Sequence, residues 1–194
     1  MNYTMIKKFY LLLLAIVASV GMSLNAAGIP CTAADLGKVL CTDGSIYATV
    51  SDATAASKTA VAMIAYIDTE NNKGLALALV EESGNANWSQ AIAKCAAKTP
   101  TVTGGTWKLA SEDEWSKIID AAGGRNALRD GFSAIGGSNL KSGGNDKYWS
   151  STESSNTEKG RCISFDNIFG GWSDASKTTN YPFYARACLA FNIG

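Results

Sequence analysis

Two neighbouring apolar runs constrain the fold of this chain more than any other feature. Residues 60–67 and 74–80 are almost continuously hydrophobic, and the polar residues 68–73 separate them. A short apolar run bounded by turn residues is typical of a strand that is buried on both faces. The two runs therefore predict a pair of buried strands joined by a polar turn.

Further strands are expected on both sides of this pair. The turn Thr42-Asp43-Gly44 lies between two extended segments, residues 38–41 and 45–50, and an Asp-Gly turn in this setting predicts a β-hairpin. Near the end of the chain, residues 148–155, 160–167 and 182–191 also have the composition of strands.

Two helices are predicted from their start signals. Asn87 with Gln90, and Ser111 with Glu114, have the spacing of a capping box, and an apolar stripe of helical period follows each pair. The acidic residues 112–114 are interpreted as first-turn residues that offset the helix dipole, rather than as catalytic carboxylates. After Gly123 the chain becomes rich in Gly, Ser and Asn, which predicts a long irregular region with at most one short helix near residues 126–132.

The chain contains no histidine, and this absence excludes most hydrolytic and zinc chemistry. Ser-His and Cys-His dyads and histidine-ligated zinc are impossible, and no motif places paired carboxylates. We therefore expect a protein that is not an enzyme and that needs no metal or cofactor. The 17 basic and 17 acidic residues cancel, so a nucleic-acid partner is not expected either.

The N-terminal segment has the layout of a secretory signal. Lys7 and Lys8 precede an apolar run over residues 9–20, and small or polar residues follow up to Ala27. The sequence thus predicts a signal peptide over residues 1–26 and one domain over residues 27–194. The run is too short for a membrane span, so the expected location is the periplasm, the cell surface or the medium.

Export changes the interpretation of the five cysteines, because disulfides persist in oxidising compartments. The odd number leaves at least one thiol unpaired, and the spacing matches no zinc motif. Structural disulfides or buried thiols are expected from this pattern, and a reactive thiol is the alternative.

Four motifs stand out along the chain: GTWKLASEDEW at residues 105–115, YWSSTES at 148–154, RCISF at 161–165 and YARACLAF at 184–191. Together they resemble a family of exported domains that are common in gut Bacteroidetes and have a C-type-lectin-like fold. The resemblance implies an α+β fold in which two helices flank a mostly antiparallel sheet, with a long irregular loop region on one face. It also implies a disulfide from the first helix to the last strand, between Cys95 and Cys188, with Cys31 to Cys41 as the next pair. The calcium-binding triplets of sugar-binding C-type lectins are absent, so no metal site is predicted.

The C-terminal part is also similar to ligand-binding proteins diversified by retroelements. This similarity implies that scattered side chains between residues 148 and 191 face a partner, which would be a surface protein or a glycan. Tyr, Trp, Asn and Ser are common in such surfaces, and the polar neighbours of Trp172 and Tyr181 predict that both are exposed. The predicted ligand-binding residues are Arg161, Asp166, Asn167, Phe169, Trp172, Asp174, Asn180, Tyr181 and Phe183, with Ser155 and Asn156 beside them.

The function expected from these observations is an exported, non-catalytic, adhesin-like or receptor-like binding module. The first alternative is a structural or accessory subunit of a surface appendage. An enzyme similar to sulfatase-modifying factors is less favoured, because the characteristic cysteine and arginine motifs of those enzymes are absent.

Overall fold

The computed structural model describes residues 28–168, 170–178 and 183–194. These residues form ten β-strands, four short α-helices and a 3-10 helix, η1 (Ala33–Asp35). The helices are α2 (Val50–Ala55), α3 (Trp88–Ala96), α4 (Glu112–Ala121) and α5 (Arg125–Ala134). The strands are β1 (Val39–Cys41), β2 (Ile46–Tyr47), β3 (Ala60–Asp68), β4 (Lys73–Ala78), β5 (Gly105–Leu109), β6 (Lys147–Glu153), β7 (Lys159–Ser164), β8 (Gly171–Ser176), β9 (Phe183–Tyr184) and β10 (Ala187–Asn192).

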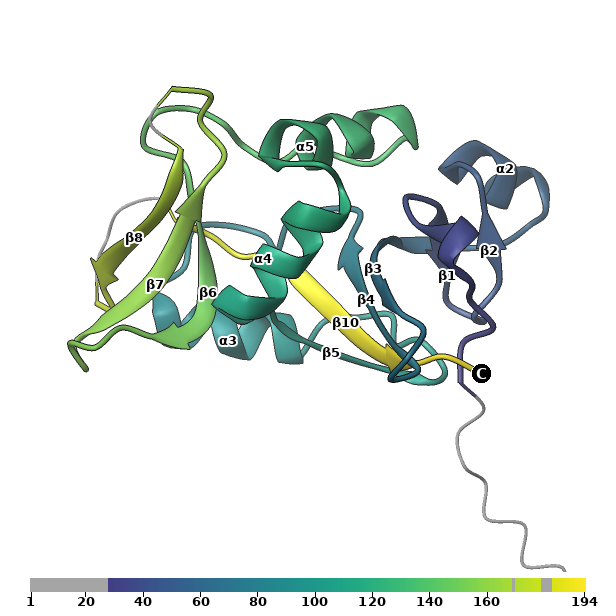
Figure 1. The fold of residues 1–194 in the computed structure, drawn as a ribbon, viewed down its shortest axis with the longest axis horizontal. Helices are drawn as coiled ribbons and strands as arrows, with labels where there is room; N and C mark the ends of the chain where they lie inside the picture. Colours follow the sequence, from purple (N-terminus) through teal and green to yellow (C-terminus); the bar gives the residue numbers. More distant parts are fainter. Residues whose placement is uncertain (1–27, 169, 179–182) are drawn as a thin grey trace, which may run out of the picture.

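The larger sheet has six strands in the order β2-β1-β3-β4-β10-β5, all paired antiparallel (Figure 1). The predicted hairpin β1–β2 and the predicted buried pair β3–β4 are both confirmed. The last strand, β10, lies between β4 and β5, so the C-terminal segment is an interior strand of this sheet.

The smaller sheet has four strands in the order β8-β7-β6-β9 and lies at one end of the molecule (Figure 1). Strands β6, β7 and β8 form an antiparallel meander, and β9 pairs parallel with β6. The predicted strand over residues 182–191 is therefore divided, because its start joins the smaller sheet as β9 and its end joins the larger sheet as β10.

The predicted fold class is wrong. The expectation was two helices flanking one mostly antiparallel sheet, whereas the described residues form two sheets and the helices are few and short. The difference arises at β8, whose polar sequence GWSDAS has no apolar alternation but pairs with β7 along its whole length. Strands β6, β7 and β8 thus belong to a separate sheet instead of joining the larger one.

The core consists of two clusters, which lie on opposite faces of the larger sheet. In β4, Ala76 and Ala78 belong to the first cluster, while Leu75 and Leu77 belong to the second, as the two-residue period of a strand requires. Helix α3 packs on the first cluster, and α4 and α5 pack on the second. The smaller sheet contributes to both, through Trp149 in the first cluster and residues such as Tyr148 and Ile163 in the second.

The start signals of the two predicted helices are confirmed. The Asn87 side chain accepts a hydrogen bond from the backbone N–H of Gln90 at the start of α3, and Ser111 does the same for Glu114 at the start of α4. Both capping boxes are complete. The short helix expected near residues 126–132 is also present, and it extends over the ten residues of α5.

The predicted disulfide between Cys95 and Cys188 is not formed, nor is the alternative between Cys31 and Cys41. All five cysteines are free and buried. The physical reason is that each expected pair is divided between the two faces of the sheet: Cys95 and Cys31 belong to the first core cluster, and Cys188 and Cys41 belong to the second. Burial raises the pKa of Cys95 to about 12 and that of Cys31 to about 11.

Thiol labelling checks this arrangement. We expect iodoacetamide at pH 8 to leave all five cysteines of the folded protein almost unlabelled, because the reactive thiolate is scarce when burial raises the thiol pKa. The same reagent should label five thiols after unfolding in guanidinium without reductant. A count of three or one under those conditions, measured by mass spectrometry, would instead reveal one or two disulfides.

Candidate functional site

The hairpin formed by β7 and β8 carries most of the predicted ligand-binding residues that the structure describes. Arg161 lies on β7, Trp172 and Asp174 lie on β8, and Asp166 and Asn167 lie in the loop between the two strands. The strand register places Arg161 opposite Asp174 and Ile163 opposite Trp172. These side chains therefore share one face of the smaller sheet, the face that turns toward α4 and α5.

Other predicted residues are placed differently. Phe183 is buried in the first core cluster, where its ring centroid lies 4.8 Å from that of Trp149, so its assignment to a displayed surface is wrong. Trp172 was expected to be exposed but is half-buried against the second cluster. Ser155 and Asn156 are exposed in the loop after β6. Phe169, Asn180 and Tyr181 lie outside the described residues.

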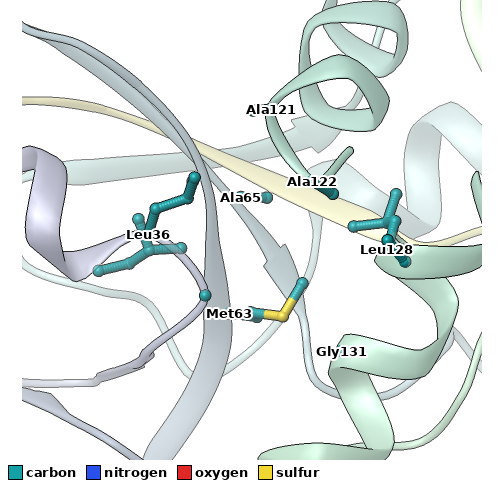
Figure 2. Close-up of a pocket in the computed structure, with 10 residues that line it drawn as sticks. Leu36, Met63, Ala65, Ala121, Ala122, Leu128 and Gly131 are labelled. Carbon is teal, nitrogen blue, oxygen red and sulfur yellow. The ribbon is translucent and has the colours of Figure 1, made fainter. Parts of the chain in front are cut away.

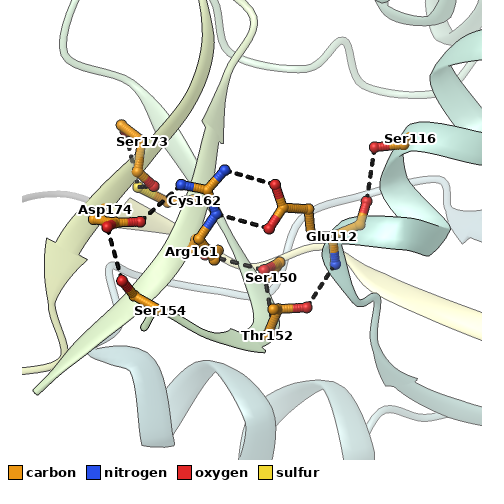
Figure 3. A network of polar contacts seen from close by, with 9 residues as sticks. All are labelled: Glu112, Ser116, Ser150, Thr152, Ser154, Arg161, Cys162, Ser173 and Asp174. Carbon is orange, nitrogen blue, oxygen red and sulfur yellow. Dashed lines mark hydrogen bonds and ion pairs between the residues drawn. The ribbon is translucent and has the colours of Figure 1, made fainter. Parts of the chain in front are cut away.

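Arg161 is the centre of a polar network that joins α4 to the hairpin (Figure 3). Its Nε and Nη2 atoms donate to the two carboxylate oxygens of Glu112 at 2.7 and 2.6 Å, and its Nη1 donates to Asp174 at 2.8 Å. Asp174 also accepts a hydrogen bond from the hydroxyl of Ser154 at 2.7 Å. The hydrogen bonds from Arg161 and Ser154 lower the pKa of Asp174, so this carboxylate stays ionised well into the acidic range.

The first turn of α4 is tied to the smaller sheet by the same residues. The backbone N–H of Glu112 donates to Thr152 Oγ1 at 2.9 Å, and its carboxylate forms the two-pronged pair with Arg161. Glu114 closes the capping box and pairs with Lys108, while Asp113 pairs with Lys117. The interpretation of these acids as first-turn residues is consistent with these contacts, but Glu112 also orients Arg161, and a bidentate pair of this kind fixes direction as well as distance.

A cleft of about 330 Å³ lies between α4, the start of α5 and the hairpin. Ile119, Ile163 and Trp172 form its apolar walls, and Ser116, Asp120 and Arg125 are its polar ones. The guanidinium of Arg161 lies 5.6 Å from the centre of the Trp172 ring, a cation–π contact that helps to hold the indole in place. The cleft is completed by the backbone of Gly124 and Gly171, both of which have the positive φ that favours glycine.

Two arginines of α5 hold the loop between β7 and β8. Arg125 donates from Nη1 to the carbonyl of Ser164 at 3.1 Å, and Arg129 donates to the side chain of Asn167 at 2.9 Å. A side chain at Gly170 would collide with the Arg125 guanidinium, because a Cβ there would lie 2.2 Å from Nη1. Because its side chain accepts the hydrogen bond from Arg129, the predicted residue Asn167 connects the loop to α5 in this structure.

Sequence reasoning missed the residues that α4 and α5 contribute to the cleft. Ser116 and Asp120 lie one helical turn apart on α4, on the side that also carries Ile119. The signal was present in part, because Glu112, Ser116 and Asp120 recur with a spacing of four residues. That spacing places polar residues on one face of a helix, but it does not show which partner the face meets.

A second hollow, of about 230 Å³, lies on another side of α4 and α5 and differs in character (Figure 2). Side chains from β3, the end of α4 and α5 surround it, among them Met63, Ala122 and Leu128, with Leu36 at its margin. Its lining carries no charged side chain, and none of the predicted ligand-binding residues lies in it. The cleft beside Trp172 is therefore the better match to the predicted binding residues.

Comparisons with known proteins leave the site to be interpreted from its own chemistry. No protein-family model matches this chain, and no curated protein matches it in sequence. Within residues 28–168, 170–178 and 183–194, no helix is long and apolar enough to cross a membrane.

Proposed function

We propose that this protein is an exported, non-catalytic binding module whose ligand contacts the β7–β8 hairpin and the cleft beside Trp172. The observation that carries the proposal is the gathering of Arg161, Trp172 and Asp174 on one face of the hairpin, next to a cleft. Trp and Arg are the residue types that contribute most to binding energy at interfaces. Ile168 in the adjoining loop is 81% exposed, the most exposed large apolar side chain among the described residues.

The frame that supports these side chains is suited to binding without large rearrangement. Arg161 is held by carboxylates from α4 and β8, and the loop is held by two arginines of α5. Side chains fixed in this way lose little conformational freedom on binding, which favours affinity.

The test is a binding screen with a Trp172→Ala variant. The purified protein is screened against a printed glycan array and an array of cell-surface protein ectodomains, and each hit is titrated by biolayer interferometry. We expect Trp172→Ala to weaken binding by about 30-fold or more, because it removes a central aromatic contact. Since Trp172 is half-buried, the free energy of unfolding should fall by about 1–2 kcal/mol, and circular dichroism should show a folded protein.

Val80→Ala is the matched control. Val80 is an exposed apolar residue (55%) that does not line the cleft beside Trp172, so its truncation should leave binding unchanged. Equal affinities of the folded Trp172→Ala variant and the unchanged protein for every hit would refute the assignment of the binding surface.

A role as a structural or accessory subunit of a surface appendage is the second candidate, and the position of β8 favours it. Among the described residues, β8 pairs with β7 alone and forms the edge of the smaller sheet. An edge strand can accept a further strand from another chain. The register places the backbone N–H of Ser176 on the open edge of β8. Concentration-dependent polymers in electron micrographs of the purified protein, lost when Ser176 is replaced by Pro, would favour this role.

The similarity to retroelement-diversified proteins stays a prediction. Sequencing the DNA beside the gene checks it: a near-copy of the stretch encoding residues 148–191, differing mainly at adenines and next to a reverse-transcriptase gene, is the expected signature.

A further inference from the structure

The cleft beside Trp172 presents two opposite charges that do not neutralise each other. Asp120 at the end of α4 and Arg125 at the start of α5 both line it. Arg125 directs Nη1 to the Ser164 carbonyl, and within the described part of the chain the exposed Asp120 carboxylate has neither a hydrogen bond nor an ion pair. The guanidinium retains further N–H donors, since it has five in all. A carboxylate that can pair with a cation and a guanidinium that can pair with an anion thus line the same cleft.

The rest of the lining is apolar and rigidly placed. Ile119, Ile163 and the Trp172 indole provide the walls, and Arg161 holds the indole from outside the cleft. Such a surface suits an aliphatic or aromatic group, because burial of apolar area is the main non-directional contribution to binding. At about 330 Å³ the cleft lies at the lower end of the range for ligand pockets, so it suits a small ligand.

We propose that this cleft binds a small zwitterion with an apolar side chain, of the class of the neutral amino acids. The ammonium would pair with Asp120, the carboxylate would accept hydrogen bonds from Arg125, and the side chain would lie against Trp172 and the two isoleucines. This inference rests on the proposed function and specifies its ligand class. A polyol, a simple amine or a simple carboxylate would leave at least one of the two charges unmatched.

Isothermal titration of a set of related compounds tests the proposal. L-Leucine carries both charges, 4-methylpentanoate lacks the ammonium, 3-methylbutylamine lacks the carboxylate, and methyl α-glucoside is an uncharged polyol. We expect leucine to bind about fivefold more tightly than either singly charged analogue, the effect of one solvent-exposed ion pair. Glycyl-leucine separates the two charges by one more residue. If it binds more tightly than leucine and also depends on Asp120, short peptides are the source of the zwitterion.

Asp120→Asn is the decisive variant, because Asp120 is exposed and its loss should not disturb the fold. It should weaken leucine about fivefold while leaving 4-methylpentanoate unchanged or tighter. Asp113→Asn is the matched control: this carboxylate is on the same helix, is exposed, pairs with Lys117 and does not line the cleft. It should leave both affinities unchanged.

Equal binding of leucine and 4-methylpentanoate would overturn the proposal, as would equal effects of Asp120→Asn and Asp113→Asn. Binding of methyl α-glucoside alone, or of none of the compounds at millimolar concentration, would do so as well. The proposed function would survive any of these outcomes if a hit from the glycan or ectodomain array still depended on Trp172. The proposed function would fail independently of this inference if no array hit depended on Trp172.

Discussion

Replacing Arg186 with Met is expected to lower the free energy of unfolding by about 3–5 kcal/mol, the usual loss when one partner of a buried ion pair is removed. Arg186 is fully buried just before β10. Its guanidinium donates to the carbonyls of Ala78 and Ser138, pairs with Glu81 at 3.3 Å, and lies 4.6 Å from the centre of the Phe132 ring. The substitution therefore leaves two carbonyls without this donor and the Glu81 carboxylate without its cation.

The reason for so large an effect is that this one side chain connects segments that are distant in sequence. It joins the end of β4, the loop after α5 and the start of the last strand. Glu81 is shared with Tyr148, whose hydroxyl donates to the same carboxylate oxygen, and burial together with this hydrogen bond raises the pKa of Tyr148. Loss of Arg186 thus also disturbs the attachment of β6.

A double-mutant cycle in urea distinguishes this account from simple loss of packing. Glu81→Gln should cost less stability in the Arg186→Met background than in the unchanged protein, because the carboxylate it removes has already lost its cation. Costs that add without coupling, or a loss below about 1 kcal/mol for Arg186→Met, would contradict the assignment of Arg186 as a connecting residue.

The parts of the fold that were predictable from sequence are those set by local signals. Asn87 and Ser111 mark the start of their helices, because each side chain accepts a hydrogen bond from the free backbone N–H three residues later. Such a contact lies within one helical turn and can be recognised from the sequence. The β1–β2 turn and the β3–β4 pair are likewise short-range features.

The parts that were not predictable depend on contacts between distant segments. Strand β8 has too little apolar content to be recognised, and it is a strand because β7 pairs with it and because Arg161 neutralises Asp174 across the pair. The same applies to the cysteines: spacing in sequence cannot tell that Cys95 and Cys188 belong to core clusters on opposite faces of the larger sheet.

The candidate site, too, could be predicted only in part from the sequence. The similarity to retroelement-diversified proteins implied Arg161, Trp172 and Asp174 as ligand-binding residues, and the structure brings these three together. The sequence could not reveal that Glu112, 49 residues before Arg161, orients its guanidinium. Nor could it reveal that α4 and α5 supply the charged residues that line the cleft. Glu112 offsets the dipole of α4 and also pairs with Arg161. Because the first role already explains an acidic residue at this position, the sequence gives no sign of the second.

The second large effect concerns the attachment of the smaller sheet, which carries the β7–β8 hairpin of the candidate site. Trp149 of β6 is fully buried in the first core cluster, contacts Phe183 edge to face, and donates from its indole N–H to the carbonyl of Ala86 at 2.8 Å. We expect Trp149→Ala to lower the free energy of unfolding by about 3–5 kcal/mol, because it opens a large cavity and leaves that carbonyl without its donor.

Hydrogen exchange shows where the stability is lost. Because Trp149 connects the smaller sheet to the first cluster, amides of β6, β7 and β8 should lose more protection in Trp149→Ala than those of β3 and β4. Trp88→Phe is the matched control: Trp88 is half-buried and also bonds the smaller sheet, through its indole N–H and the carbonyl of Ser150, so a smaller loss is expected. If protection fell equally in both sheets, the smaller sheet would not be a separately detachable unit, and damage to it would reach the binding surface only through unfolding of the whole protein.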